Sequence, residues 1–456
     1  MFSKILIANR GAIAVRIART CERMGIGTVA VFSDADQGAP HVAACGEAAR
    51  IGEAPVSKSY LNASAIIEAA KQHRVQAIHP GYGLLSEKAE FARAAAAAGL
   101  VFVGPEPETL EKLGDKLRAR EIARAAGVAA VPGSEAAVSG AVAAKEQAAH
   151  LGYPVVVKAA AGGGGIGMQV VADETQLERA MQSCADRGAS AFGDNRIYIE
   201  RCLSRPRHVE VQLLADGFGH CVALGDRECS LQRRHQKILE ESPAPAFANI
   251  PHNRMTREEL CDAAVKIAKH SAYRNAVTCE FLADADGSVY FLEFNARLQV
   301  EHGVTEFCTG IDLVEMQLRI AAGEPLPQSV KQARASGHSI EARIYAEDPQ
   351  RGFLPKPGRV QVLRWPIDTP GKLRIDSSVT SGSDVTPYYD PLVAKVITYG
   401  QTRHEALLTL DRVLAQTVIT PLTTNISFLR DVLGDEAFRA GQYDTTTVAR
   451  LVATAS

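Results

Sequence analysis

The chain has 456 residues, 46% of them hydrophobic and 22% charged, which is the composition of an ordinary globular protein with room for about three domains. Its 50 Lys and Arg against 52 Asp and Glu leave a net charge of −2, which argues against a nucleic-acid partner or a polybasic membrane anchor. The nine cysteines include no C-x-x-C pair, so we expect neither a disulfide framework nor a zinc site. Without a signal peptide or an apolar run of about 18 residues, we predict a cytoplasmic protein with no membrane span.

The first hundred residues alternate short apolar runs with amphipathic stretches. The runs at 4–8, 28–32, 75–79 and 100–103 predict buried strands, and the stretches between them predict helices. Strand, turn and helix repeated in this order predict an α/β domain with a doubly wound parallel sheet.

A second region begins near Gly114, with a helical stretch at 115–126 and a strand at 154–160. The tetraglycine at 162–165 follows this strand at once, and Lys158 lies just before it. Consecutive glycines let backbone N–H groups approach an anion, and a nearby lysine adds charge for a phosphate. A flexible surface loop is the alternative, but the position between two strands beside a lysine favours a phosphate site.

Residues 279–295 predict a hairpin whose two-residue turn is the Asp-Gly pair at 286–287. Pairing about this turn places Glu280 opposite Glu293, and like charges about 5 Å apart across two strands are destabilising. A bridging Mg²⁺ would remove that penalty, with Asn295 as a third oxygen ligand. The alternative is a solvated hairpin face whose carboxylates never meet.

The same alternation continues through 296–300, so Arg297, Gln299 and Glu301 are expected on one strand face, offering a guanidinium, an amide and a potential base. Residues 208–213 also alternate strictly, which predicts a strand with one wet face. The basic run at 232–237 is either a solvated face or an anion site beside the glycine loop.

A third region starts near residue 337 with the segment SIEARIYAED. A proline-rich turn follows at 353–358, and a helical stretch is expected near 403–415. No internal repeat appears along the chain.

Together these segments resemble the biotin carboxylase subunit or domain of biotin-dependent carboxylases, in the family's order over about 1–447. The segments that carry the resemblance are KILIANRG (4–11), AIHPGYGLLSE (77–87), FVGP (102–105), GDK (114–116), KAAAGGGGIGM (158–168), RHVEVQ (207–212), CSLQRRHQK (229–237), EFNARLQVEH (293–302) and YYDPLVAKV (388–396). The resemblance implies an ATP-grasp fold, α+β overall. Its expected parts are an N-terminal doubly wound domain (1–113), an ATP-grasp domain (114–335) with a mobile lid at about 131–203, and a C-terminal domain (336–447).

The reaction that the resemblance implies has two steps. ATP and bicarbonate give carboxyphosphate and ADP, and carboxyphosphate then delivers CO₂ to N1 of biotin. The implied cofactors are ATP and Mg²⁺, or Mn²⁺ in its place, with bicarbonate as substrate and biotin on a separate carrier.

Site roles follow from the resemblance, position by position. ATP contacts are implied for Lys116, Lys158, Gly162, Gly163, Gly164, Gly165, Met168, Glu200, Leu203, His208, Gln232 and His235. Metal binding is implied for Glu280, Glu293 and Asn295. Bicarbonate would be held by Lys237, Arg297, Gln299 and the Val300 backbone, Glu301 would deprotonate it, and Arg343 would stabilise the biotin enolate oxygen.

Three positions depart from the family pattern. Ala12 stands where Glu is usual, Ile166 where Arg is usual, and Gly303 where Pro is usual. Ile166 is expected to weaken the lid's charge contacts to phosphate, and Gly303 to loosen the turn after the base. GGGGIGM, ALGDREC and NARLQVEH look more like the urea carboxylase branch than the acetyl-CoA carboxylase branch.

None of the six methionines precedes a lysine, as the biotinylated lysine of family carriers requires, and the chain ends at Ser456. We therefore expect a separate biotin carboxyl carrier protein and a carboxyltransferase in trans, and a homodimer by family likeness. One alternative is another ATP-grasp carboxylate ligase, but those lack the HQK and RLQVEH motifs. The other is a catalytically silent nucleotide-binding paralogue, against which the retained Lys237, Arg297, Glu301 and Arg343 argue.

Overall fold

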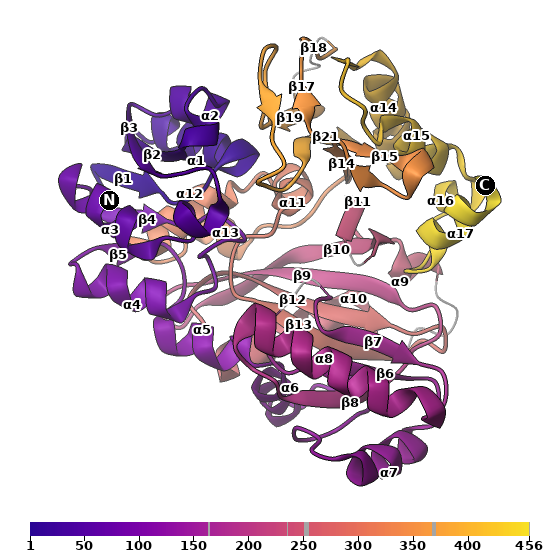
Figure 1. Ribbon diagram of the computed structural model, residues 1–456. Helices are drawn as coiled ribbons and strands as arrows, with labels where there is room; N and C mark the ends of the chain where they lie inside the picture. Colours follow the sequence, from indigo (N-terminus) through magenta and orange to yellow (C-terminus); the bar gives the residue numbers. More distant parts are fainter. Residues whose placement is uncertain (163–164, 235, 250–254, 367–370, 456) are drawn as a thin grey trace.

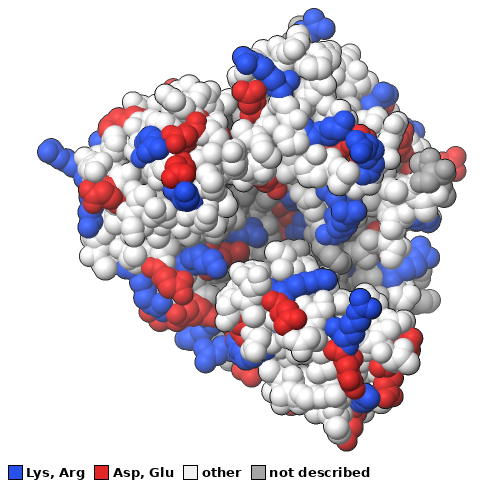
Figure 2. Space-filling view, in the orientation of Figure 1, with Lys and Arg blue, Asp and Glu red and all other residues white. Residues whose placement is uncertain are grey.

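The structure is a computed structural model that describes residues 1–455 except 163–164, 235, 250–254 and 367–370. Three lobes surround a central sheet: the N-terminal lobe in indigo, the C-terminal lobe in orange and yellow, and a magenta lobe at the bottom of the view (Figure 1). Figure 2 shows a hollow between them, with charged side chains of both signs at its floor. None of the helices in the described ranges has the length and apolarity to cross a membrane.

The N-terminal lobe is built on a five-stranded parallel sheet in the order β3-β2-β1-β4-β5. This confirms the predicted doubly wound domain, with helices packed against apolar strands. The strands are β1 (Lys4–Ile7), β2 (Gly27–Ser33), β3 (Glu47–Gly52), β4 (Ala77–His79) and β5 (Val101–Phe102), and the helices are α1 (Gly11–Arg23), α2 (Pro40–Ala43), α3 (Ala63–Gln72) and α4 (Ala89–Ala97). The sequence missed β3, because it is an edge strand whose residues EAARIG carry a weak apolar signal.

The magenta lobe spans the expected lid, residues 131–203. Its sheet has the order β7-β6-β8, made of β6 (Val155–Ala159), β7 (Met168–Val171) and β8 (Ile197–Arg201), and is packed by α7 (Ala141–Leu151) and α8 (Leu177–Phe192). Valines and isoleucines of β6 and β8 form its small apolar core with α7 and α8. Helices α5 (Pro107–Gly114) and α6 (Lys116–Ala125) precede the lid, and the Asp115 side chain caps α6.

An eight-stranded sheet joins the second and third regions, in the order β13-β12-β9-β10-β11-β14-β21-β19. Its strands are β9 (Arg207–Ala215), β10 (Cys221–Arg233), β11 (Gln236–Ser242), β12 (Asn275–Ala283), β13 (Val289–Asn295), β14 (His338–Tyr345), β19 (Leu373–Ser377) and β21 (Leu392–Gly400). Every residue of β9 is buried, so the predicted wet face is wrong: its polar side chains face other charged groups inside the protein.

Helices and short strands complete the two larger lobes. The helices are α9 (Ala246–Asn249), α10 (Arg257–His270), α11 (His302–Thr309), α12 (Leu313–Ala321), α13 (Gln328–Lys331), α14 (Arg403–Gln416), α15 (Ile426–Gly434), α16 (Glu436–Arg439) and α17 (Thr447–Ala455). Two-stranded pairs are formed by β15 (Glu347–Asp348) with β16 (Leu354–Pro355), β17 (Gly358–Arg359) with β20 (Asp384–Val385), and β18 (Val362–Arg364) with β22 (Val418–Thr420). The predicted helix near 403–415 is therefore confirmed as α14.

The hairpin β12–β13 places Glu280 opposite Glu293, as predicted, although its turn differs from the prediction. Ala283 pairs with Val289, so the chain reverses through the longer loop 284–288 and not through a two-residue turn. A bulge between Glu280 and Phe281 then restores the expected pairing, because the extra residue on β13 compensates for the longer loop.

The strand expected over 296–300 is wrong. Strand β13 ends at Asn295, and the chain leaves the sheet in an irregular segment before α11 begins at His302. Gln299 and Glu301 both bind buried partners although the segment is irregular. The alternation of polar residues therefore does not indicate a strand here.

Candidate active site

Lys237 of β11 is the centre of a buried group of charges on the eight-stranded sheet, a group called the floor below. Its Nζ donates to Glu210 Oε2 at 2.7 Å, to Glu280 Oε1 at 3.0 Å and to Glu301 Oε1 at 2.6 Å. The lysine side chain is only 13% exposed, and the three carboxylates are almost fully buried. The basic run at 232–237 is therefore no solvated face at this position: the lysine lies where an anion could replace a carboxylate.

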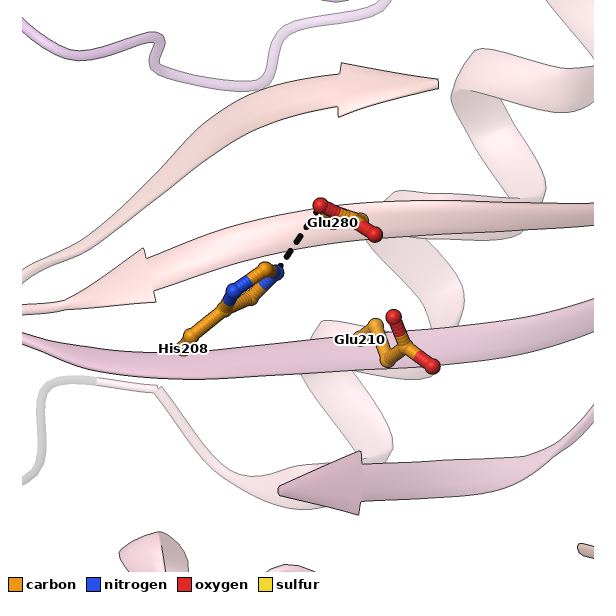
Figure 3. A group of neighbouring side chains, drawn as sticks. All are labelled: His208, Glu210 and Glu280. Atoms are coloured by element: carbon orange, nitrogen blue, oxygen red, sulfur yellow. Dashed lines mark ion pairs between the residues drawn. The ribbon is translucent and has the colours of Figure 1, made fainter. Parts of the chain in front are cut away.

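Glu280 belongs to a second cluster with His208 and Glu210, drawn in Figure 3. His208 and Glu210 lie on β9 and Glu280 on the neighbouring β12, and His208 Nε2 lies 2.9 Å from Glu280 Oε2. One ligand atom from each residue lies within 4.8 Å of the others, a spacing that suits a metal ion. Burial alone would raise the pKa of Glu280, but Lys237 and His208 hold it well below its usual range, so the group is a carboxylate.

The two other expected metal ligands, Glu293 and Asn295, are bound to cations of the chain itself. Glu293 Oε2 accepts a hydrogen bond from Lys116 Nζ at 2.5 Å, and Asn295 Oδ1 accepts one from Arg297 Nη2 at 3.2 Å. Oxygen donors of this kind fit Mg²⁺, which is held by one or two carboxylates together with substrate phosphates. Glu280, Glu293 and Asn295 thus meet the chemical requirement, and Lys116 would exchange Glu293 for a phosphate.

Arg227 of β10 is a further cation beside these carboxylates, and the sequence analysis did not predict it. Its Nε donates to Glu210 Oε1 at 2.5 Å, and its other nitrogens donate to Gln212, Thr278 and Thr305. The residue is fully buried. The polar residues of β9 were the signal that could have revealed this arginine, but they were interpreted as facing solvent. A fully buried guanidinium needs carboxylate and hydroxyl acceptors on every side.

Glu301, the expected base, lies at the N-terminal end of α11 and is fully buried. Its Oε1 accepts from Lys237, and its Oε2 accepts from Arg343 Nη2 at 2.9 Å. Burial alone would raise the pKa of Glu301, but Lys237, Arg343 and Arg227 together hold it well below the usual range. The residue is ionised and able to accept a proton, although its three cations weaken it as a base.

Arg343 of β14 is shared between two carboxylates. Its Nη2 also forms an ion pair with Glu240 of β11, a residue that the sequence analysis did not place in the site. Burial raises the pKa of Glu240 to about 8, with Glu341 and Glu301 adding to the effect and Arg343 opposing it.

The expected bicarbonate residues converge although they do not share a strand. Gln299 Nε2 donates to Glu280 Oε1 at 3.0 Å, and Arg297 Nη1 donates to Gln299 Oε1 at 2.9 Å. The Val300 carbonyl accepts from Lys395 Nζ at 2.5 Å, so a buried lysine from β21 fixes the backbone just before the base.

The expected ATP residues are divided between the lid and the eight-stranded sheet. Lys158 of β6 pairs with Glu200 of β8, and Glu200 also pairs with Arg120 of α6, which links the lid to the body. Gln232 Nε2 donates to His208 Nδ1 at 2.6 Å.

Met168 and Leu203 are half-buried in the lid, and Gly162 adopts a φ of +90°, where a Cβ would meet the Phe192 ring. Gly165 also has a positive φ, of +75°. Gly163, Gly164 and His235 lie outside the described residues.

Gly303 does not lie in a loosened turn, as expected, but in the first turn of α11, where it is buried. A Cβ at this position would meet Arg374 Nη2 and Ile397 Cδ1. The glycine therefore makes room for an arginine from β19 behind the base.

Three family models match the chain in succession. They are described as "Biotin carboxylase, N-terminal domain" over residues 1–110, "Carbamoyl-phosphate synthase L chain, ATP binding domain" over 115–329, and "Biotin carboxylase C-terminal domain" over 341–450. The biotin carboxylase of Halalkalibacterium halodurans is 48% identical over 452 residues, which cover 98% of this chain and 97% of that protein. The mitochondrial propionyl-CoA carboxylase alpha chain of Homo sapiens is 45% identical, and the match covers 97% of this chain but 60% of that one.

Solved structures agree with these matches. A biotin carboxylase from Campylobacter jejuni in complex with β-γ-ATP superposes with a TM-score of 0.94 at 40% identity, covering 99% of each chain. The biotin carboxylase domain dimer of Hydrogenobacter thermophilus 2-oxoglutarate carboxylase, in complex with MgADP, ADP and bicarbonate, gives a TM-score of 0.93 at 40% identity, covering 99% of this chain and 98% of that one.

Proposed function

The chain belongs to the biotin carboxylase family, and from this premise we propose that the buried cluster around Lys237 is where bicarbonate is activated. The enzyme is an ATP-dependent ligase that carboxylates biotin. The observation that carries the proposal is the position of Lys237 and Arg343 on the two oxygens of Glu301. Two cations beside one carboxylate suit a small anion next to a base.

Bicarbonate is a poor nucleophile until it loses its proton. In the proposed step, Glu301 accepts the O–H proton of bicarbonate, and the freed oxygen attacks the γ-phosphorus of ATP as ADP leaves. Lys237, Arg297, Gln299 and the Val300 backbone hold the anion. Mg²⁺, held by Glu280, Glu293 and Asn295, supplies charge neutralisation on the phosphates when it is bound.

The lysines that would contact ATP are bound to carboxylates of the chain itself. Lys116 pairs with Glu293, and Lys158 pairs with Glu200. Both pairs would break when Mg²⁺ and ATP are bound, because Glu293 would then hold the metal and the two lysines would bind phosphates. The remaining nucleotide contacts are assigned to Gly162, Gly163, Gly164, Gly165, Met168, Glu200, Leu203, His208, Gln232 and His235.

Transfer to biotin is the second step, and Arg343 is proposed to stabilise the negative charge that develops on biotin. The biotin enolate forms when N1–H loses its proton, which the phosphate released from carboxyphosphate can accept. A guanidinium beside the ureido oxygen stabilises this enolate, and its N1 then attacks CO₂. The lid, residues 131–203, would exclude water from carboxyphosphate, which hydrolyses readily.

The proposed assembly follows the relatives. We assign domains to 1–113, 114–335 and 336–447, a biotin carboxyl carrier protein and a carboxyltransferase as partners, a homodimer, and a cytoplasmic location. The match covers 97% of a biotin carboxylase and 60% of a propionyl-CoA carboxylase alpha chain.

Phosphate release by the purified protein with Mg-ATP and bicarbonate, with and without free biotin, tests the function. We expect bicarbonate-dependent release that biotin stimulates. Release independent of bicarbonate, or none at all, would contradict the proposal, and an unchanged rate in a Glu301→Gln variant would remove Glu301 as the base.

A further inference from the structure

Glu240 is a buried acid beside the proposed catalytic residues that has no role in the reaction as derived above. It lies on β11, directly opposite Glu341 of β14, and its side chain is fully buried. Among the described residues, its ion pair is with Arg343 Nη2, the same nitrogen that donates to Glu301. One guanidinium nitrogen therefore serves two carboxylates, and neither Glu240 oxygen has another hydrogen-bond partner among the described residues.

The surroundings of Glu240 contain more acid than base. Glu341, Arg343 and Tyr345 face it from β14, Glu301 from the turn before α11, and Cys229 from β10. Burial raises the pKa of both Tyr345 and Cys229, so these two groups are neutral at physiological pH. Glu341 is nearer to a second cation, Lys395, whose Nζ lies 3.4 Å from its Oε2 and 3.7 Å from Asp376 Oδ2. Arg343 is thus the cation for which Glu240 and Glu301 compete.

This competition bears directly on the base. Three cations lower the pKa of Glu301 and make it a weak proton acceptor, and Arg343 is one of the three. An ionised Glu240 pairs with Arg343 and so weakens the attraction between Arg343 and Glu301. It also adds a nearby negative charge, and both effects make Glu301 more basic. A protonated Glu240 leaves Arg343 to Glu301 alone.

We propose that Glu240 is a positioning residue that divides Arg343 between itself and Glu301, and thereby controls how readily Glu301 accepts the proton of bicarbonate. The inference rests on the proposed function in one respect, the role of Glu301 as the base. It predicts a pH dependence with a definite sign: Glu240 gains its charge as pH rises through about 8, so bicarbonate-dependent turnover rises through the same range.

The test compares Glu240→Gln with the unchanged protein in steady-state phosphate release, from about pH 6 to about pH 9.5. Glutamine keeps the size of the side chain but never ionises. We expect kcat to fall by about 3- to 10-fold above pH 8, the rise near pH 8 to disappear, and KM for ATP to stay within about twofold. Persistence of the rise in this variant would overturn the proposal.

Glu241→Gln is the matched control, because Glu241 is the next residue of β11 and equally buried, but binds Arg403, His338 and Tyr443 instead. It should lower thermal stability and leave the pH profile unchanged. If Glu240→Gln does not fold, Glu240→Asp decides: the shorter carboxylate should keep the rise and displace its midpoint, and an undisplaced profile would overturn the proposal. A Glu301→Gln protein with an unchanged rate would instead remove Glu301 as the base, the part of the proposed function on which this inference rests.

Discussion

The floor and the lid differ in what holds their residues together. At the floor, Arg227, Glu210 and Glu301 are fully buried, and each ionic group has two or more partners. The lid encloses a core of valine, isoleucine, leucine and alanine, and exposes Ile166 and Val170 to 53% and 56%. The sheet thus holds charges whose loss should impair chemistry or folding, whereas the lid should mainly affect how tightly the nucleotide is held.

Glu301→Gln should give the largest effect and tests the chemical side of this comparison. The amide keeps the hydrogen-bonding shape but cannot accept the proton, so kcat for bicarbonate-dependent ATP cleavage should fall by about 10²- to 10⁴-fold. Nucleotide affinity, measured by calorimetry, should change little because Glu301 lies away from the lid. A variant that lost ATP affinity and kept kcat would break the distinction between floor and lid.

Arg227→Met tests whether the buried charges also hold the sheet together. In the part of the chain that the structure describes, the change leaves Glu210 paired with Lys237. Removing one partner of a buried ion pair costs about 3–5 kcal/mol. Chemical denaturation should report that loss of unfolding free energy.

Arg196→Met is the matched control on the lid side, where the arginine is 48% exposed and pairs with Asp115 and Asp194. This change should cost less than about 1 kcal/mol, since exposed ion pairs contribute little. Equal losses in the two variants would contradict the comparison.

The lid could be predicted from the sequence more fully than the floor. Strands β6 and β7 and the glycine run between them were predicted, because short-range apolar patterns and turn residues determine them. The wet face assigned to β9 was wrong, because a buried polar face has the same period of two as a solvated one. Glu280 and Glu293 were paired correctly only because a bulge offset the error in the turn.

The residues that the sequence missed at the floor share one property: their partners are distant along the chain. Arg227 meets Thr305, Lys395 meets Val300, and Arg343 joins Glu240 to Glu301. Neither spacing nor composition indicates such pairs, since they arise only when β10, β11, β14 and β21 are aligned in one sheet. The resemblance supplied Glu301 and Arg343, but not Glu240.

Gly303→Ala probes the packing at the start of α11, two residues after the base. The added methyl group would meet Arg374 and Ile397, so the side chains behind α11 must shift. Overpacking of this kind costs about 1–3 kcal/mol, and kcat should fall with it if α11 displaces Glu301. Gly310→Ala offers a contrast with open space around its Cβ, although its φ of +71° adds backbone strain of its own. Full stability of the Gly303 variant would show that α11 can move freely.

Ile166→Arg should give the smallest effect, and it tests the lid side of the comparison. Ile166 lies on the exposed end of the glycine segment, 53% accessible, where the family usually has arginine. A guanidinium there could contact a phosphate when the lid closes, but a mobile, half-exposed ion pair is worth at most about 1 kcal/mol. KM for ATP should therefore fall by about two- to fivefold, while kcat at saturating ATP stays the same. Ile166→Gln, polar but uncharged, should leave KM unchanged. A large rise of kcat with arginine would mean that lid closure, and not proton transfer at Glu301, limits turnover, and the division of roles between lid and floor would then have to be redrawn.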